Sequence, residues 1–448
     1  MVVSRDKTPT AQETFMQMAK AAGLRGRLLV TIGLLILVRL GVFLPVPGIN
    51  RTAFQDFINN NVSGQLIGFL DIFSGGGLSA LGIFALGILP YINASIIMQL
   101  LTAAIPSLED LQKNEGEAGR RKISQVTRYV ALGWSILQSI GLSLWLNNLT
   151  SNFGTVANSP GPLFVAETVL ALTAGSMFVM WLSEIITERG IGNGASLLIF
   201  INIVAVLPRS LGQTLEVVEK GNRDEVGGVI ILLLVFLAII VGIVFVQEGT
   251  RRIPIVSARR QVGRRLYRER SSYLPLRLNQ GGVMPIIFAS AVLFLPLSLA
   301  QLTRNEYLAQ LANHLSQNSA SPFSPWLFII VYLLLIIFFS YFYASLIVNP
   351  VDLSQNLKKM GASIPGIRPG RATSEYVERV LNRLTFLGAV FLGLVAIIPT
   401  AVESATRVTT FQGLGATSLL ILVGVAIDTA KQVQTAVISQ RYEGMVKQ

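Results

Sequence analysis

The feature that most constrains this chain is a series of ten long apolar segments separated by polar stretches. They cover residues 28–46, 84–104, 127–146, 164–183, 193–208, 229–247, 282–301, 326–347, 385–400 and 413–430. A helix of about 20 mostly apolar residues is long enough to cross the hydrocarbon core of a bilayer. The chain is also only 13% charged, against roughly a quarter in soluble domains. This pattern predicts an all-α integral membrane protein with ten transmembrane helices.

Basic residues are unevenly distributed among the segments that join these helices. If the N-terminus is cytoplasmic, 29 of the 36 Lys and Arg residues fall in cytoplasmic segments. Because Lys and Arg accumulate on the cytoplasmic side of multi-pass proteins, this distribution predicts that both termini are cytoplasmic. Topology therefore accounts for most of the net charge of +12. We expect a multi-pass protein of the cell (inner or plasma) membrane or of a thylakoid membrane.

Two short sequence patterns occur twice, once in each half of the chain. The pattern G-x-x-P-x-I-x-A-S of residues 87–95 returns at residues 282–290, and residues 192–199 resemble residues 413–421 with one inserted residue. Each half then holds five helices, and since five is odd, the second half enters the membrane from the opposite side. The sequence therefore predicts two inverted five-helix halves around a central pore.

The predicted spans divide the chain into four parts. These are a cytoplasmic N-terminal segment (1–27), a first five-helix half (28–208), a second five-helix half (229–431) and a cytoplasmic C-terminal tail (432–448). The second half carries two long cytoplasmic loops, at about 247–281 and 348–384.

The second span looks interrupted. Residues Ser74–Gly77 and Pro90 bracket the apolar piece 78–89, which is too short to cross the hydrocarbon. Irregular backbone at that depth is tolerated only where it is buried in protein or lines a cavity. The alternative is an ordinary external loop that precedes a normal helix.

The repeated patterns place aliphatic residues at related positions of four spans. Two pairs are spaced one helical turn apart within a span, and two further residues are the repeat partners of members of those pairs. A ring of such side chains at the midplane would block ions by dewetting. Ordinary helix packing or lipid contact is the alternative for each residue. The candidates are Ile88, Ile92, Ala195, Ile199, Ile287 and Ile421.

The residues needed for most catalytic chemistry are missing from the sequence. There is no cysteine and a single histidine, His314, which excludes disulfides, zinc sites and thiol or Ser-His catalysis within the chain. No GxxxxGK[ST] phosphate loop occurs. We expect a protein that is not an enzyme, with no catalytic residue, no metal and no cofactor. An intramembrane protease would need a buried dyad or metal pair that one histidine cannot supply.

A secondary transporter is the main alternative class, since transporters also use inverted repeats and broken helices. Such a protein needs a polar site at the midplane. Arg39 is the one clear ionisable residue within a predicted span, and the candidate pore positions are aliphatic. The sequence therefore favours a channel over an ion-coupled transporter.

The two cytoplasmic loops carry more basic residues than topology requires. Dense arginines in 247–281 fit the phosphates of ribosomal RNA or lipid head groups, or an acidic protein face. In the other loop, flanking Pro and Gly residues would hold Arg368 rigidly at a tip. Simple positive-inside charge is the alternative for both. The candidate docking residues are Arg251, Arg252, Arg259, Arg260, Arg264, Arg265 and Arg368.

Several motifs resemble a known family in the same order along residues 28–443. They are Phe73–Gly76, Ile83–Ile88, Pro90–Ile92, Gly119–Gln125, Ile186–Gly194 and Pro365–Gly370. These motifs identify the chain as similar to the bacterial and plastid-type SecY family, the large channel subunits of the Sec protein translocon. The resemblance implies a channel that passes secretory polypeptides across the membrane and releases signal and transmembrane helices laterally into it.

The resemblance also implies roles for particular residues. It places the pore ring on the six aliphatic candidates, although Ala195 is smaller than the side chain often found there. It places polar residues of a lateral gate, between spans two and seven, on Asn93, Gln99, Asn279 and Ser290. It places an external plug on Ile72, Phe73, Ser74, Gly75, Gly76, Gly77, Leu78, Ser79, Ala80 and Leu81.

The partners follow from the same resemblance. They are small membrane subunits of the SecE and SecG type, the SecA motor ATPase, the ribosome through contacts of the basic loops with its RNA, signal peptides and nascent chains, and membrane lipids. Energy would come from the motor or the ribosome, and the chain itself would be a passive conduit.

Overall fold

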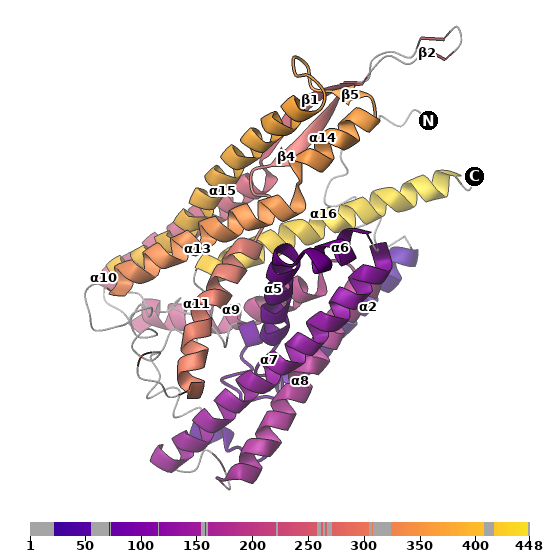
Figure 1. Ribbon diagram of the computed structural model, residues 1–448. Coiled ribbons are helices and arrows are strands. Elements are labelled where there is room, and N and C mark those ends of the chain that lie inside the picture. The colour runs from indigo at the N-terminus through magenta and orange to yellow at the C-terminus, as the bar shows by residue number, and fades with distance from the viewer. Residues whose placement is uncertain are drawn as a thin grey trace. The chain divides into compact units, whose positions relative to one another are not determined.

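The computed structural model describes residues 22–54, 71, 73–114, 116–153, 157, 160–220, 223–257, 261–262, 265–266, 271–303, 307, 324–406 and 416–446. In this part of the chain ten helices have 16 residues or more (Figure 1). They are α2 (Ala22–Val42), α5 (Leu89–Ala104), α7 (Gly116–Phe153), α8 (Pro162–Arg189), α9 (Gly194–Lys220), α10 (Arg223–Glu248), α11 (Met284–Thr303), α13 (Ser324–Ile347), α15 (Arg371–Thr406) and α16 (Ala416–Val446). Each overlaps one predicted apolar segment, so the prediction of ten spanning helices is confirmed.

Most helices extend beyond the apolar segment that predicted them. α7 begins at Gly116 and α15 at Arg371, each more than ten residues before its apolar segment, and α16 continues to Val446 through the predicted cytoplasmic tail. Hydropathy marks only the part of a helix that lies in hydrocarbon, because polar residues at a helix end cost nothing in water.

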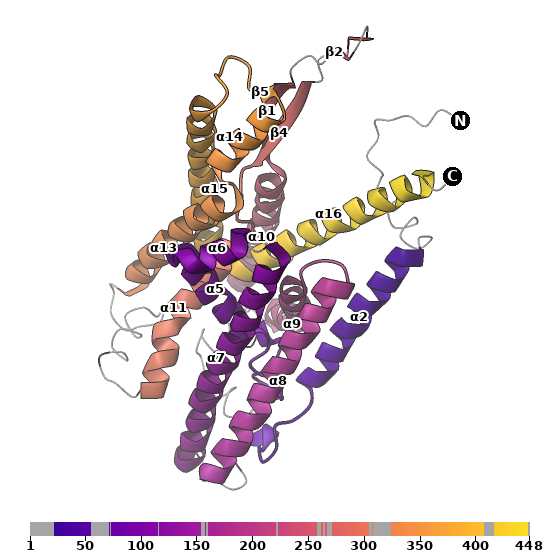
Figure 2. The same ribbon diagram turned by 45° about the vertical axis from the view of Figure 1, so that its right-hand side comes forward.

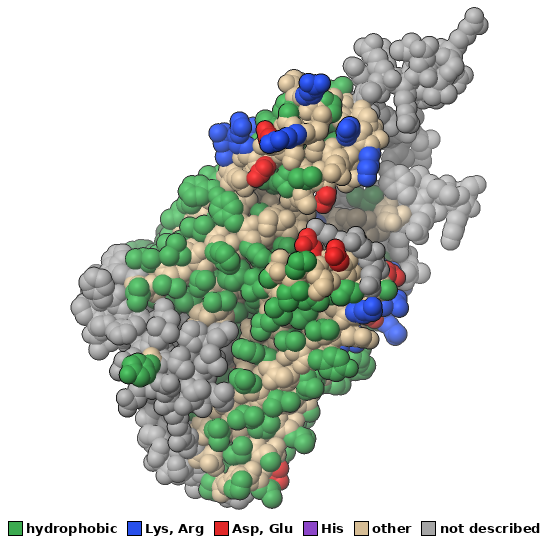
Figure 3. Space-filling model, viewed as in Figure 1, with side chains coloured by type: hydrophobic (Ala, Val, Ile, Leu, Met, Phe, Trp, Pro, Cys, Tyr) green, Lys and Arg blue, Asp and Glu red, His purple; other side chains and the backbone are tan. Residues whose placement is uncertain are grey.

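Apolar side chains cover the outward sides of the helices (Figure 3). On α10, for example, Ile230, Leu234, Leu237 and Val241 are each more than half exposed. A soluble protein would bury such a stripe against a core. Six helices of the described residues are both long and apolar enough, by length and composition, to cross a membrane, among them Pro162–Arg189 and Val226–Glu248. Hydrocarbon is the solvent in which these surfaces are stable.

The chain forms two compact units. Unit 1 holds the described residues of 22–219 and 425–446, and unit 2 holds those of 220–406 and 416–424. The long helix α16 therefore contributes its first nine residues to unit 2 and the remainder to unit 1.

The first four helices of each half pack in the same order. In unit 1, α5 packs against α7, α7 against α8, and α8 against α2. In unit 2, α11 packs against α13, α13 against α15, and α15 against α10 (Figure 2). The second helix of each half thus contacts the third, the third the fourth, and the fourth the first. This shared order is independent support for the inverted repeat that two short sequence patterns predicted.

The local structure at the first repeated pattern is also the same in both units. Gly87 has a φ of 53° and Gly282 a φ of 59°, and a helix begins two residues after each. Only glycine adopts this left-handed conformation without strain. The prolines of the pattern, Pro90 and Pro285, fall at the second helical position, where the missing N–H costs no hydrogen bond.

A polar side chain caps the carbonyl of each of these glycines. Ser176 Oγ of α8 donates a hydrogen bond of 3.2 Å to Gly87 O, and Asn279 Nδ2 donates one of 2.7 Å to Gly282 O. The two irregular segments therefore share a left-handed glycine, and in both a side chain donates a hydrogen bond to the carbonyl of that glycine.

The second span is interrupted, as the sequence predicts. Residues 75–88 form successive turns, and regular helix begins only at Leu89. These turns are bonded to the chain that follows α2, with Val46 N donating to Leu81 O (3.1 Å) and Ile83 N to Leu44 O (2.8 Å). Backbone groups that a helix would satisfy internally are therefore satisfied by a neighbouring segment, which permits irregular structure at this depth.

Unit 2 also contains a small sheet that the sequence did not lead us to expect. Strands β4 (Ser271–Arg277), β1 (Thr250–Ser257) and β5 (Ala362–Ser363) form an antiparallel sheet in that order, and β2 (Gln261–Val262) pairs with β3 (Arg265–Leu266). The two predicted cytoplasmic loops are thus joined into one folded body. Two short helices complete the described elements, α6 (Pro106–Asn114) in unit 1 and α14 (Pro350–Lys359) in unit 2.

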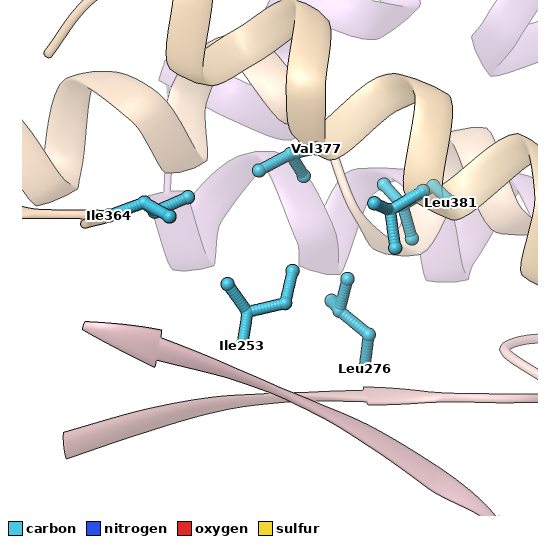
Figure 4. Close-up of a cluster of buried hydrophobic side chains, with 6 residues drawn as sticks. Ile253, Leu276, Ile364, Val377 and Leu381 are labelled. Carbon is cyan, nitrogen blue, oxygen red and sulfur yellow. The ribbon is translucent and has the colours of Figure 1, made fainter. Parts of the chain in front are cut away.

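One face of the sheet packs on the first turns of α15. Ile253 and Leu276 of the sheet meet Val377 and Leu381 of α15, and Ile364 joins them from the second loop (Figure 4). The signal for this sheet was present in the sequence. Ile253 and Ile255 alternate with polar residues or proline at the period of two that a strand with one buried face requires.

Candidate functional site

The isoleucines of the candidate pore ring are buried. Their exposed fractions run from 0% at Ile421 to 6% at Ile92, and Ala195 is half-buried. Lipid contact, one of the alternatives for these residues, does not fit such burial. Unit 1 contains Ile88, Ile92, Ala195 and Ile199, and unit 2 contains Ile287 and Ile421.

Two of the ring residues occupy matching positions in their helices. Ile92 and Ile287 are each the fourth residue of a helix, α5 and α11, while Ile199 lies on α9 and Ile421 on α16. The sequence repeat is thus reproduced as a repeat of position along a helix.

The candidate plug is a compact set of turns with its own polar core. Asp71 accepts hydrogen bonds from Ser79 N (2.7 Å) and Ser79 Oγ (2.9 Å), while Ser74 Oγ accepts from Leu78 N (3.0 Å). Side chains of Asp and Ser commonly stabilise turns in this way. Sequence reasoning missed Asp71, which lies one residue before the predicted plug. Ile72, a predicted plug residue, lies outside the described residues.

Two side chains from neighbouring helices hold the candidate plug by its backbone. Asn202 Nδ2 of α9 donates to Phe73 O (2.8 Å), and Arg39 Nη1 of α2 donates to Gly75 O (2.7 Å). The sequence had singled out Arg39 as an ionisable residue within a span, without a partner. The structure supplies the partner, 36 residues further along the chain.

The candidate plug and the turns that follow it, through Ala85, also pack closely against α2 and α8. A Cβ atom at Gly41 of α2 would overlap the ring of Phe84, and one at Gly175 of α8 would overlap the carbonyl of Ile83. Leu78 and Ala85 are buried with Val46 and Leu172 in one apolar cluster. Small residues on the helices thus allow the irregular segment to approach their backbones.

The candidate gate residues are placed in both units. Asn93 is half-buried on α5, and Gln99 Nε2 donates to Ser95 Oγ (3.1 Å) on the same helix. In unit 2, Asn279 Nδ2 donates to Gly282 O, and Ser290 Oγ lies 3.2 Å from the Tyr332 hydroxyl of α13. These hydrogen bonds of Asn279 and Ser290 lie within unit 2.

Arg368 is exposed at the tip of a loop that is well fixed. Thr373 Oγ1 donates to the Arg368 carbonyl (3.0 Å), and Ser354 Oγ of α14 donates to the Gly370 carbonyl (2.7 Å). Gly366 and Gly370 have positive φ values of 79° and 113°, which suit glycine. Below the tip, Ile364 is buried in the cluster of Figure 4. A solvated guanidinium is therefore presented on a rigid support.

Other basic side chains are exposed on the same part of unit 2. Figure 3 shows Lys and Arg gathered where α14 and the sheet lie. Those exposed near the sheet and α14 include Arg251, Arg252, Arg277, Lys358 and Lys359. Of the predicted docking residues, Arg259, Arg260 and Arg264 lie outside the described residues, and only the backbone of Arg265 is described, in β3.

The described residues contain no group of three or more His, Cys, Asp or Glu side chains that could hold a metal ion. Unit 1 contains buried aliphatic candidates and a set of turns held through its backbone, and unit 2 contains buried aliphatic candidates and an exposed basic tip.

Comparison with known proteins identifies the family. The SecY family model matches residues 82–430. The chain is 74% identical to the protein translocase subunit SecY of Synechococcus elongatus over 448 residues, which is the whole of both chains.

Solved structures share the fold at low sequence identity. One, on how the plug domain of the SecY protein stabilises the closed state of the translocation channel and maintains a membrane seal, matches with a TM-score of 0.63 and 19% identity, over 96% of this chain and 94% of that one. Another, Sec61 in the canine ribosome-channel complex from the endoplasmic reticulum, matches with a TM-score of 0.60 and 18% identity over the same shares. On the family match and the full-length relative together, the chain belongs to the SecY family of protein translocase subunits.

Proposed function

We propose that this chain is the pore-forming subunit of a protein-conducting channel, and that its six aliphatic candidates form the constriction of the pore. The observation that carries the proposal is that Ile92 and Ile287, both buried, are each the fourth residue of the equivalent second helix of the two repeats. In SecY-family channels a polypeptide passes between the halves. A ring of aliphatic side chains resists ions by dewetting, yet it makes no specific contact that would hold a passing polypeptide.

The segment 72–81 acts as the plug of this channel in our proposal. A related SecY protein is described as having a plug domain that stabilises the closed state and maintains a membrane seal. In this chain the described part of the segment is compact, buried or half-buried at every residue, and bonded through its backbone to α2 and α9. Such turns can leave as a body, because Asp71 and Ser79 tie them to one another.

The lateral gate lies between α5 and α11, the equivalent second helices of the two halves. An apolar signal helix leaves the pore for lipid through this seam, since about 20 apolar residues are more stable in hydrocarbon. Asn93, Gln99, Asn279 and Ser290 line it, and hydrogen bonds within membranes contribute only about 0.6 to 2 kcal/mol each. A seam with few strong interactions can part.

The cytoplasmic sheet and the Arg368 tip dock the partner that supplies energy. The chain supplies no phosphate-binding loop, so we propose the SecA motor ATPase and the ribosome as alternating partners, with small subunits of the SecE and SecG type beside the helices. A solved structural relative is part of a ribosome-channel complex. Both termini are cytoplasmic in this proposal, the host membrane is the plasma or thylakoid membrane, and the chain itself is not an enzyme.

A flux experiment separates this function from that of a secondary transporter. Purified protein in vesicles is offered a signal-bearing preprotein with the motor and ATP, or a radiolabelled small solute with an ion gradient. The proposal predicts ATP-dependent protection of the preprotein from external protease and no concentrative solute uptake. Gradient-driven solute uptake without preprotein protection would refute it.

A further inference from the structure

Arg39 is a cation in the last turn of α2, within the apolar segment 28–46, and the acceptor described for it belongs to the plug segment. Its Nη1 donates a hydrogen bond of 2.7 Å to Gly75 O, while its guanidinium lies 5.8 Å from the ring centre of Phe43, the residue that follows α2. Ionisable side chains at this depth are costly and need a partner. The partner here is a backbone carbonyl of the one segment that must move when the channel opens.

Asn202 makes the equivalent contact two residues earlier in the segment. Its Nδ2 donates 2.8 Å to Phe73 O, and the side chain is 3% exposed. Its Oδ1 is buried and accepts no hydrogen bond from the residues that the structure describes. The side-chain amide of Asn202 therefore donates a hydrogen bond to the plug through its nitrogen, while its oxygen has no donor among the described residues.

Gly75 lies between these two side chains. A Cβ atom at this position would be 2.5 Å from Arg39 Nη1 and 2.6 Å from Asn202 Oδ1, and the residue has a φ of +69°. The backbone thus approaches both side chains as closely as glycine allows. Arg39 of α2 and Asn202 of α9 thus hydrogen-bond to the segment from two different helices, and glycine at position 75 allows both side chains to approach it.

Asn202 is also linked to the pore ring through its own helix. It follows Ile199 by three residues, so the two side chains lie on the same face of α9, one turn apart. Both are buried. A polypeptide that displaces Ile199 must shift this face of α9, and such a shift withdraws Asn202 from Phe73.

We propose that Arg39 and Asn202 form a latch that holds the plug shut by its carbonyls, and that displacement of the ring at Ile199 releases it. The inference rests on the proposed role of 72–81 as a plug. Arg39 supplies the stronger contact, because a hydrogen bond from a charged donor is roughly twice as strong as one from a neutral donor. Asn202 supplies the link to the ring. In this latch, Asn202 on α9 responds to displacement of the ring, and Arg39 on α2 makes the stronger hydrogen bond to the plug.

The latch predicts a local effect that general stabilisation of unit 1 does not. The chain has no native cysteine, so an Ala80→Cys reporter in the half-buried plug gives a clean signal for a membrane-impermeant maleimide added from outside. A Ser135→Cys reporter, on α7 and fully buried, reports loosening of the unit elsewhere. Both are tested in the full chain, purified with its partner subunits and reconstituted.

The variants are Arg39→Met, Arg39→Lys and Asn202→Leu. Without a translocating polypeptide, Arg39→Met raises labelling at position 80 and the open probability of single channels about tenfold, and Asn202→Leu raises both by a smaller factor. Arg39→Lys, which keeps one charged donor, restores most of the parent behaviour. Labelling at position 135 stays at the parent rate in each variant.

Arg51→Met is the matched control. Arg51 Nη2 also donates a 2.7 Å hydrogen bond to a backbone carbonyl, that of Phe43, but this carbonyl is outside the plug. The control variant keeps the parent labelling rate and open probability.

If both Arg39→Met and Asn202→Leu keep the parent labelling rate and open probability, the latch is refuted. A labelling rate at position 135 that rises as much as the rate at position 80 also refutes it, because the whole unit is then loosened. If Arg39→Met fails to insert, Asn202→Leu decides alone. Preprotein transport by the parent in the same vesicles is measured in parallel. Its absence refutes the proposed function, whereas normal parent transport with unchanged variants refutes only the latch.

Discussion

Ile92 and Ile287 are each the fourth residue of a helix that begins two residues after a left-handed glycine. The two residues belong to different compact units and to chain segments 195 residues apart. Two buried side chains that share such a local frame are what an inverted repeat places on opposite sides of its axis.

Polar substitutions in the ring should make the closed channel leak ions. Ile92→Asn and Ile287→Asn introduce groups that hold water in the constriction, so we expect conductance in planar bilayers to rise at least severalfold. Ile92→Leu keeps the apolar character and serves as the control. Unchanged conductance in Asn variants that insert into the membrane would show that these isoleucines do not seal the closed pore.

Charge reversal at the loop tip should uncouple the partner. Arg368→Glu presents the wrong charge on a rigid support, and we expect motor-driven preprotein transport to fall about tenfold or more. Folding should be unaffected, because an exposed tip contributes little to stability. Arg371→Glu, an exposed arginine three residues away that pairs with Glu375, should transport normally. Normal transport by Arg368→Glu would show that the tip is not the docking contact.

Locking the seam between α5 and α11 should block release of signal helices. Cysteines at positions 89–99 are paired with cysteines at positions 283–295, and at least one pair should oxidise, since a disulfide needs Cα atoms within roughly 7 Å. The locked channel should regain transport when reductant is added. Pairs with a cysteine at the exposed Ile230 test for non-specific oxidation. A locked pair that transports normally would exclude this seam as the gate.

Loss of packing beneath the sheet should impair docking while leaving the pore intact. Ile253→Ala removes buried methyl groups from the cluster of Figure 4, at a cost of about 2 to 5 kcal/mol in the stability of that region. We expect faster proteolysis within residues 250–277 and slower motor-driven transport, with unchanged ion conductance. Tyr273→Ala, at a 59% exposed position of β4, should change proteolysis little. Equal effects of both substitutions would contradict the packing account.

Much of the fold was predictable because lipid imposes a simple rule on the sequence. Apolar segments such as 229–247 and 326–347 must be helices, since hydrocarbon satisfies no backbone group. The repeat was detectable at residues 87–95 because a left-handed glycine and a helix-starting proline restrict their positions tightly. The ends of α7 and α15 were missed because water tolerates polar helical turns that hydropathy does not register.

The contacts of the site were harder to predict because they join residues far apart in sequence. Arg39 stood out as a charge in a span, but no local pattern indicates that Gly75 accepts its hydrogen bond. Asn202 was not singled out, since a single amide in an apolar helix usually has a packing role. The sheet was not predicted because Ile253 and Ile255 lie in an arginine-rich loop, and the charge of that loop indicated docking without indicating a strand.

The most direct measurement of the central claim is whether a translocating polypeptide passes the ring. A preprotein with one cysteine is arrested in transit, and the channel carries a single cysteine at Ile92, Ile199, Ile287 or Ile421. A further channel variant carries its cysteine at Leu234, a lipid-facing position of α10 that is 61% exposed. The account predicts disulfides between the preprotein and each of the four ring positions, and none with position 234. Cross-linking at position 234 as efficient as at the ring, or no cross-linking at the ring positions of either half, would contradict it.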